Sequence, residues 1–439
     1  MERSNGECEL LHTGGKKVSV LFLLILMLCG FTACGKEEKE IVEITLIHGW
    51  GSTEPDHVAM RQIYQDFEKE HPYIKINLLS MPSADDVLTK VEDMLAVGEI
   101  PDIVFTAGTG RDTIYEFMIE NNYAVDLMPY IEADSLFKSN VSGSILSYWT
   151  DEENHLYTVS DVLLLASYWY NEEIFVAAGI RELPSTWPEF IQVCEQIQSW
   201  ADTHGKKVVP IVLDTEHILY LTNAMLADIN PDMLKKIEEN QIDIRSGEFT
   251  QMLIWMKELY QYSDLMENYT YRDTLHSFNA QETAIYINGV WANTMIDEKL
   301  KVSYAAFPNR EGTGTTNISS CVGYIVGESK DQRKVEASVE FIKYMLSEPV
   351  ANLILTRTGQ IPSNPKVEIK DTTENNRLYQ AVSCVRNAAV IMETPDNIWD
   401  LALKTVYGES VKLYLTDQIS LDEFSRRLKV KEKVNKINF

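Results

Sequence analysis

The chain has 439 residues, more than one hydrophobic core usually organises, so we expect two domains. Hydrophobic residues make up 45% and charged residues 24%, which are ordinary values for a globular protein. The formal net charge is -27, and no sustained basic run follows the N-terminal segment. This balance argues against a nucleic-acid-binding class, because such proteins need a basic face.

The first forty residues have the pattern of an export signal. Two lysines precede an apolar run over residues 18–28. That run is shorter than the roughly 20 residues a membrane-spanning helix needs, and it suits a secretory signal. Two small residues then precede Cys34, an order that resembles a bacterial lipobox, although Phe31 stands where that motif usually has Leu. We expect a lipoprotein signal peptide over 1–33, a lipid on Cys34 and a tether over 34–40. A plain secretory signal and an uncleaved anchor are the alternatives.

Strand and helix patterns alternate after the tether. Strands are predicted over 43–50, 73–81 and 101–108, and helices over 57–71 and 85–99. This order predicts an α/β fold with a parallel sheet. Ligands of such sheets bind at the loops beyond the carboxyl ends of the strands. We therefore expect functional residues in the loops over 48–52 and 106–110.

The rest of the chain is mixed in pattern. Residues 171–271 are mostly helical, with the clearest helices over 189–200 and 249–262. Strand-like runs follow over 282–289, 301–308 and 321–327, and helices are predicted over 334–348, 397–416 and 421–430. No Pro-rich or Ser-rich linker separates these parts, so we expect the chain to pass between domains through ordinary strands.

Motifs of catalysis and metal binding are missing from the sequence. The six cysteines form no CxxC pair and no Cys/His cluster of zinc spacing. We expect Cys194, Cys321 and Cys384 to be free thiols, although a bridge between two of them is possible from spacing alone. Phosphate-loop, HExxH and GxSxG motifs are absent as well. We expect neither an enzyme nor a bound cofactor or metal.

Short segments in a fixed order resemble the family 1 extracellular solute-binding proteins, the maltose-binding-protein-like receptors of ABC importers. The segments are ITLIHGW, MLAVGEIPDIVF, LYTVS, YWYNEEIFVAAGI, FNAQETAIYINGVW, VGYIVGESKDQRKVEASVEFIKYMLSE and TGQIPSN. The resemblance extends from Ile41 to about Leu428. Gln281 and Ser160 depart from it, since the family often has Gly at the first position and usually Pro near the second.

The resemblance implies a two-lobed, periplasmic-binding-protein-like α/β fold. Crossing hinge strands would join the lobes, and the ligand would lie in a cleft between them that closes by a hinge motion. The first lobe would comprise residues 41–161 and 321–347. The second lobe would comprise residues 162–320 and 348–439.

The resemblance also implies a ligand site made of aromatic rings and polar groups. Rings suit the C–H faces of a sugar, and polar side chains suit its hydroxyls. The candidate ligand contacts are Trp50, Thr106, Asp161, Trp291, Tyr324 and Trp399. For each aromatic candidate the alternative is packing inside its own lobe, and for Asp161 it is a solvated acid at the hinge.

The implied function is capture of a small solute, a mono- or oligosaccharide, and its delivery to the permease subunits of an ABC importer. The protein would be a monomer held at the outer face of the membrane by its lipid, without a nucleic-acid partner. Two alternatives remain open. One is an exported carbohydrate hydrolase with two carboxylates across a cleft. The other is a partner that presents ligand to a membrane sensor.

Overall fold

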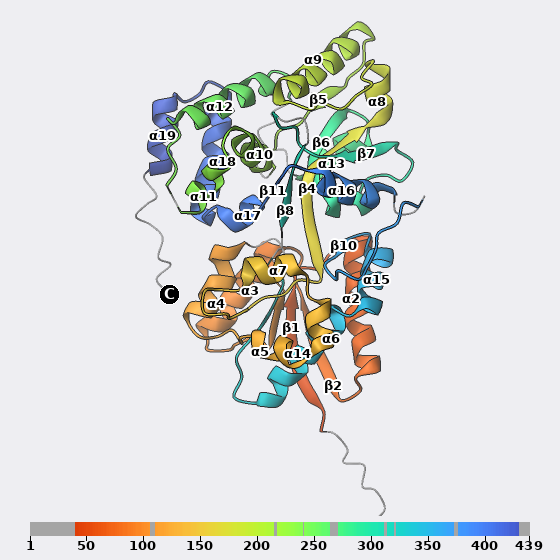
Figure 1. Ribbon diagram of the computed structural model, residues 1–439, viewed down its shortest axis with the longest axis vertical. Helices are drawn as coiled ribbons and strands as arrows, with labels where there is room; N and C mark the ends of the chain where they lie inside the picture. The colour runs from red at the N-terminus through yellow and green to blue at the C-terminus, as the bar shows by residue number, and fades with distance from the viewer. Residues whose placement is uncertain are drawn as a thin grey trace, which may run out of the picture. The chain divides into compact units, whose positions relative to one another are not determined.

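The computed structural model describes residues 40–105, 110–214, 217–239, 241–263, 271–310, 314–319, 322–372 and 376–429. The described residues from Val42 onward form one compact unit. Within it the described strands build two sheets, each covered by its own helices (Figure 1). We call the two sheets with their helices the first lobe and the second lobe.

The first lobe is built on a four-stranded sheet of order β2-β1-β3-β9. These strands are β1 (Val42–His48), β2 (Ile74–Ser80), β3 (Ile103–Phe105) and β9 (Tyr324–Val326). β1 runs parallel to β2 and β3, whereas β9 is antiparallel to β3. The strand–helix alternation predicted for the first part of the chain is therefore confirmed.

Helices from two separate stretches of the chain, 55–149 and 332–358, belong to this lobe. They are α2 (Pro55–Glu70), α3 (Ala84–Ala96), η1 (Arg111–Tyr115), α4 (Glu116–Glu120), α5 (Met128–Ala133), α6 (Ser135–Asn140), α7 (Gly143–Trp149), α14 (Gln332–Met345), α15 (Glu348–Leu353) and η3 (Ile354–Thr358). The buried core joins apolar side chains such as Ile44, Phe67 and Phe341. Val350 and Ile354 belong to it too, so this packing continues past 347, where the resemblance ends the first lobe.

The second lobe has a sheet of order β11-β8-β4-β6-β5, and β7 and β10 also pair with β4. Its strands are β4 (Val162–Asn171), β5 (Val209–Ile211), β6 (Thr283–Gly289), β7 (Val302–Ala305), β8 (Thr315–Ser319), β10 (Ile361–Pro362) and β11 (Val390–Met392). Its helices are α8 (Glu172–Ala177), α9 (Trp187–Thr203), α10 (Ile218–Ile229), α11 (Asp232–Glu238), α12 (Gly247–Tyr260), α13 (Tyr271–Asn279), η2 (Val290–Thr294), α16 (Asn376–Asn387), α17 (Pro395–Ile398), α18 (Leu401–Leu415) and α19 (Leu421–Lys429).

One predicted helix of the second lobe is interrupted. The pattern predicted a single helix over 397–416, but α17 ends at Ile398 and α18 begins at Leu401. Asp400 causes the break, because its side chain accepts a hydrogen bond from the backbone N–H of Leu403 and caps the new helix. Trp399 is left between the two helices in an extended conformation.

Three segments meet where the chain passes between the lobes, and we call this place the crossing. Val159, ahead of β4, bridges to Tyr324 of β9, and Val162 of β4 pairs with Pro362 of β10. The backbone N–H of Ser363 also donates to the carbonyl oxygen of Asp161 at 2.8 Å. The chain therefore passes between its lobes through paired strands, as the missing linker predicted.

Candidate ligand-binding site

The loop after β1 is held in place from the strand end. His48 is fully buried, and its Nδ1 accepts a hydrogen bond from the backbone N–H of Trp50 at 3.0 Å. Its Nε2 lies 3.0 Å from the hydroxyl oxygen of Ser80. Burial, with smaller effects from Arg61 and His57, lowers the pKa of His48 to about 3. The imidazole ring is therefore neutral near pH 7, and its two nitrogens connect the Trp50 backbone to Ser80 of β2.

Trp50 presents a half-buried ring in this loop. Its ring centroid lies 5.6 Å from that of Phe105, and the ring of His57 meets it edge-on at 5.0 Å. The Arg61 guanidinium donates to the carbonyl oxygens of Trp50 and Ser52 and ties the loop to α2. The ring is thus fixed in position and packs against the core of the first lobe, and the residue as a whole is half-buried.

Asp161 is a buried acid at the crossing, with only 1% of its surface exposed. Its Oδ2 accepts a hydrogen bond from the hydroxyl of Tyr324 at 2.7 Å. Its Oδ1 is buried and has no partner from any other described residue. Burial raises the pKa of Asp161 to about 7, and the Tyr324 hydrogen bond opposes that rise. The unpaired Oδ1 keeps the capacity to accept one more hydrogen bond, and in this structure it is buried away from solvent.

Trp291 is a half-buried aromatic residue of the second lobe, packed in part against the core of that lobe. It lies in η2, directly after β6, and its ring rests on the backbone of Gly289. A Cβ atom on that glycine would come within 1.9 Å of the ring, so only glycine leaves room for it. The ring of Tyr220 lies beside it, 6.4 Å away between centroids.

The remaining predicted contacts are placed differently. Tyr324 is fully buried, and Trp399 is 1% exposed. The Trp399 indole nitrogen donates to the Oδ1 of Asn223 at 2.8 Å, and its ring packs on Tyr407 at 4.8 Å. Both rings are therefore core side chains in this structure. Thr106 and the lipidation candidate Cys34 lie outside the described residues.

Within the described part of the chain, two ion pairs join the lobes, and none of their residues was a candidate from the sequence. Arg111 of η1 lies 3.5 Å from Glu238 of α11, and its guanidinium sits 5.1 Å from the ring centroids of both Tyr148 and Trp149. Arg272 of α13 lies 3.5 Å from Glu54, which precedes α2. Long-range pairs of this kind leave no signal in local sequence patterns.

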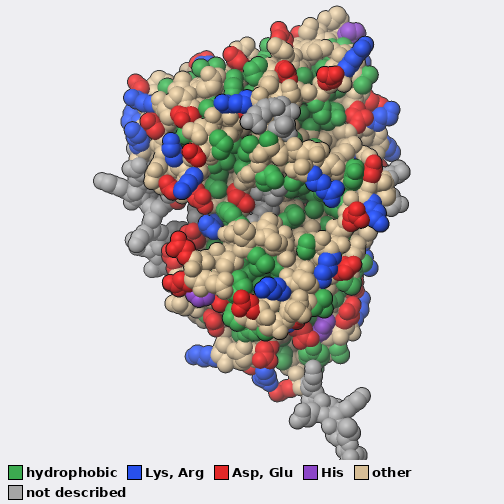
Figure 2. All heavy atoms as spheres, viewed as in Figure 1, with side chains coloured by type: hydrophobic (Ala, Val, Ile, Leu, Met, Phe, Trp, Pro, Cys, Tyr) green, Lys and Arg blue, Asp and Glu red, His purple; other side chains and the backbone are tan. Residues whose placement is uncertain are grey.

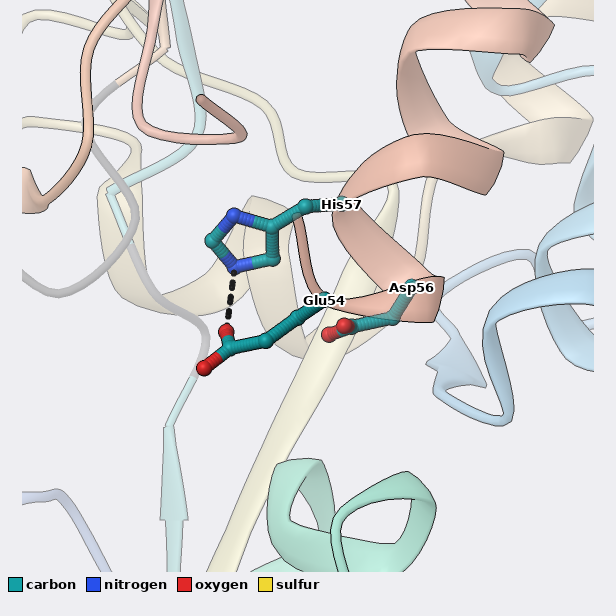
Figure 3. A group of neighbouring side chains, drawn as sticks. All are labelled: Glu54, Asp56 and His57. Carbon is teal, nitrogen blue, oxygen red and sulfur yellow. Dashed lines mark ion pairs between the residues drawn. The ribbon is translucent and has the colours of Figure 1, made fainter. Parts of the chain in front are cut away.

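One group of His, Asp and Glu side chains lies close enough together to be weighed as a metal site within the described part of the chain. It comprises Glu54, Asp56 and His57, whose candidate ligand atoms lie within 4.8 Å of one another (Figure 3). Arg272 already pairs with Glu54, and His57 Nδ1 lies 2.9 Å from the Ser52 hydroxyl. The group reads as an ion-pair cluster at the start of α2, where the helix N-terminus disfavours a cation.

The surface and the thiols add little to the site. Lysine and arginine side chains are scattered singly among acidic ones on the face in Figure 2. Cys194 and Cys384 are free thiols, as expected, whereas Cys321 lies outside the described residues. Among the helices that the structure describes, none has the length and apolar character needed to cross a membrane.

Comparisons with known proteins agree on one family. Residues 62–381 match the family described as bacterial extracellular solute-binding protein. The multiple sugar-binding protein of Streptococcus mutans is 24% identical over 360 residues, covering 75% of this chain and 78% of that protein. An ABC transporter extracellular-binding protein of Pyrococcus horikoshii is 21% identical over 408 residues, covering 90% of each chain.

A solved structure shares the fold. A solute-binding protein of Streptococcus pneumoniae in complex with the blood group A-trisaccharide superposes with a TM-score of 0.74. The alignment covers 89% of this chain and 99% of that one at 23% identity. The two-lobed α/β architecture expected from the sequence is therefore confirmed.

Proposed function

The chain belongs to the bacterial extracellular solute-binding proteins, and from this premise we propose that it captures an oligosaccharide outside the cell and delivers it to an ABC importer. The observation that carries the proposal is that the lobes and the crossing supply two half-buried tryptophans, Trp50 and Trp291, and one carboxylate oxygen without a partner, the Oδ1 of Asp161. Trp50 comes from the first lobe, Trp291 from the second, and Asp161 from the crossing.

This set of groups suits a sugar. Aromatic rings stack on the C–H faces of a pyranose and lose little conformational entropy in doing so. A carboxylate oxygen accepts hydrogen bonds from hydroxyls. The named ligands of two similar proteins, multiple sugars and a trisaccharide, support the same class of solute for this chain. We therefore favour a saccharide of two or more units, long enough to meet both rings.

In the proposed function, ligand binding changes the conformation of the protein and leaves the ligand chemically unmodified. A ligand that contacts both lobes stabilises the arrangement in which both sets of contacts exist, by its differential affinity for that arrangement. The ion pairs Arg111–Glu238 and Glu54–Arg272 would reinforce it. The importer would then recognise this arrangement and receive an unmodified sugar.

The other predicted residues take supporting roles in this proposal. Tyr324 fixes the Asp161 carboxylate by donating a hydrogen bond to its Oδ2. Trp399 stabilises the second lobe through its hydrogen bond to Asn223. Thr106 follows β3 in the sequence and stays a candidate contact. We further propose that a lipid on Cys34 holds the protein, as a monomer, at the extracellular face of the cell membrane. Residues 1–33 would be its signal peptide.

A thermal-shift screen against saccharides of one to six units tests this function. Binding to the native state alone raises the melting temperature as the ligand concentration increases. We expect a rise with at least one oligosaccharide, and chromatography of the same samples should recover the sugar uncleaved. A hydrolase would return shorter products, and a screen without any saccharide-dependent shift would remove sugars as the solute.

A further inference from the structure

Three buried side chains form one hydrogen-bonded line from α2 to the crossing. The hydroxyl oxygens of Tyr64 and Tyr324 lie 3.0 Å apart, and Tyr324 donates to Asp161 Oδ2 at 2.7 Å. Tyr64 and Tyr324 are fully buried and Asp161 is 1% exposed. Solvent therefore has little access to this line.

The line has a direction. When Asp161 is ionised, its carboxylate can only accept a hydrogen bond, and Tyr324 has a single hydroxyl hydrogen to give to it. The hydroxyl oxygen of Tyr324 must then accept its second hydrogen bond from Tyr64. Burial raises the pKa of both phenols well above 10, so both keep their hydrogens near neutral pH. The order of donation is Tyr64 to Tyr324 to Asp161.

Tyr64 also touches the base of the Trp50 loop. Its ring meets the ring of His48 edge-on, with 5.2 Å between centroids. His48 in turn accepts the backbone N–H of Trp50. Tyr64 is thus connected to two of the proposed ligand contacts, to Asp161 through Tyr324 and to the Trp50 backbone through His48.

We propose that Tyr64 is a positioning residue for ligand binding, which keeps the Asp161 carboxylate ionised and aimed by donating its hydroxyl hydrogen to Tyr324. The inference rests on the proposed function, because it takes Asp161 as an acceptor of ligand hydroxyls. It adds that the strength of this acceptor is set by a residue that does not itself touch the ligand.

The electrostatics of the site explain why such support matters. Burial raises the pKa of Asp161 to about 7, so a small change in its surroundings alters its charge at neutral pH. Among the described residues, the titratable side chain in contact with Asp161 is Tyr324 of β9, and Tyr64 of α2 lies one hydrogen bond further away. The ring of His48 in β1 contacts the ring of Tyr64 and is uncharged near neutral pH, since its pKa is lowered to about 3. A phenol that accepts one hydrogen bond becomes a better donor of the next, so Tyr64 strengthens the bond to the carboxylate.

Tyr64→Phe removes the hydroxyl and keeps the ring against His48. We expect the oligosaccharide affinity of the wild-type protein to rise with pH and level off above the ionisation of Asp161. In Tyr64→Phe this rise should move to higher pH, with affinity several-fold lower at neutral pH and recovered at about pH 9. Isothermal titration calorimetry from about pH 5 to about pH 9 measures both curves.

A matched control comes from the same core. Tyr344 is buried beside Phe67, and its hydroxyl donates to the backbone carbonyl of Ile63 at 3.4 Å, outside the line. Tyr344→Phe should leave the midpoint of the pH dependence unchanged, and Asp161→Asn should abolish the dependence. An equal loss of affinity in Tyr64→Phe at every pH would mean a merely structural role and would overturn the proposal.

A second measurement does not need a ligand. Carbon-13 labelling of aspartate carboxyls allows the Asp161 resonance, assigned by its absence in Asp161→Asn, to be titrated by NMR. The titration midpoint should be higher in Tyr64→Phe than in the wild-type protein. A midpoint unchanged by the substitution contradicts the relay. A shifted midpoint in a protein that binds no saccharide would contradict the proposed function alone.

Discussion

A Cβ atom added to Gly323 would lie 2.1 Å from the carbonyl oxygen of Val159, so the two backbones touch at the crossing. Their neighbours are bridged as well, because Tyr324 and Val159 exchange backbone hydrogen bonds of 2.7 and 3.3 Å. Only glycine permits this approach, and it places β9 against the segment that leads into β4. The crossing is therefore a close-packed joint, and its geometry determines where Asp161 lies.

Gly323→Ala should consequently be strongly destabilising. The methyl group must displace backbone, which costs about 1–3 kcal/mol in a packed interior. Gly143→Ala is the matched control, because a Cβ atom there meets nothing within 4 Å. Urea unfolding of the two variants measures the difference. Equal stability of both would contradict the close contact at the crossing.

Trp291→Ala should weaken oligosaccharide binding by about 1–3 kcal/mol, the usual loss for one stacking ring, and leave the fold intact. Trp200→Ala provides the control, because Trp200 is also half-buried but lies on α9, where it packs beside His204. Calorimetry on both variants decides the role of the ring. Unchanged affinity in Trp291→Ala would remove this ring from the site.

Trp399→Phe should show the opposite pattern. The substitution leaves the Oδ1 of Asn223 unpaired in a buried place, which costs about 1–3 kcal/mol of folding free energy. At a temperature where the Trp399→Phe variant is fully folded, its ligand affinity should change much less than that of Trp291→Ala. A Trp399→Phe protein with native stability and poor binding would restore Trp399 as a ligand contact.

Stability should also depend on pH through one buried acid, Asp161, and one half-buried acid, Glu393. Burial raises the pKa of Asp161 from 3.8 to about 7, and that of Glu393 from 4.5 to about 7. Between about pH 4 and pH 7 the folded state keeps protons that the unfolded state has released, so stability falls as pH rises. Above about pH 7 this contribution is lost and the dependence levels off.

Asp161→Asn and Glu393→Gln should each remove part of this slope, at most about 1.4 kcal/mol per pH unit per acid. Denaturation of the wild-type protein and both variants across this range gives the difference for each acid. If the slope of Asp161→Asn matched that of the wild-type protein, Asp161 would be ionised throughout and its carboxylate would have partners that the structure does not show.

Cys34→Ser should release the protein from the membrane of its host. The lipid is the proposed attachment, and a plain serine cannot carry it in the same way. Fractionation of cells that express the wild-type protein and Cys34→Ser, with a labelled fatty acid in the medium, measures both location and modification. Label retained on Cys34→Ser would place the anchor elsewhere.

Local patterns accounted for much of the first lobe and for less of the site. The first three strands and their helices follow from apolar periodicity, since each element buries its own stripe. Asp161 and Tyr324 were both candidates from the sequence, but the hydrogen bond between them depends on how β9 pairs with β3. Pairing between distant segments is not written in either segment alone.

The burial of the Trp399 ring also could not be predicted from the sequence. Its position in the sequence matches a ligand aromatic of the family it resembles, yet its ring turns inward. The capping side chain of Asp400 breaks the predicted helix there, and the indole finds Asn223 on α10. Exposure of a ring depends on such distant partners, so sequence alone could not separate Trp399 from Trp291.

Sugar capture by this protein is best measured by calorimetric titration of the purified protein with an oligosaccharide found by thermal shift, followed by analysis of the recovered sugar. We expect saturable binding, an affinity reduced in both Trp50→Ala and Trp291→Ala, and a sugar recovered unchanged. Binding that survives loss of both rings, or a sugar returned in pieces, would contradict the proposed function.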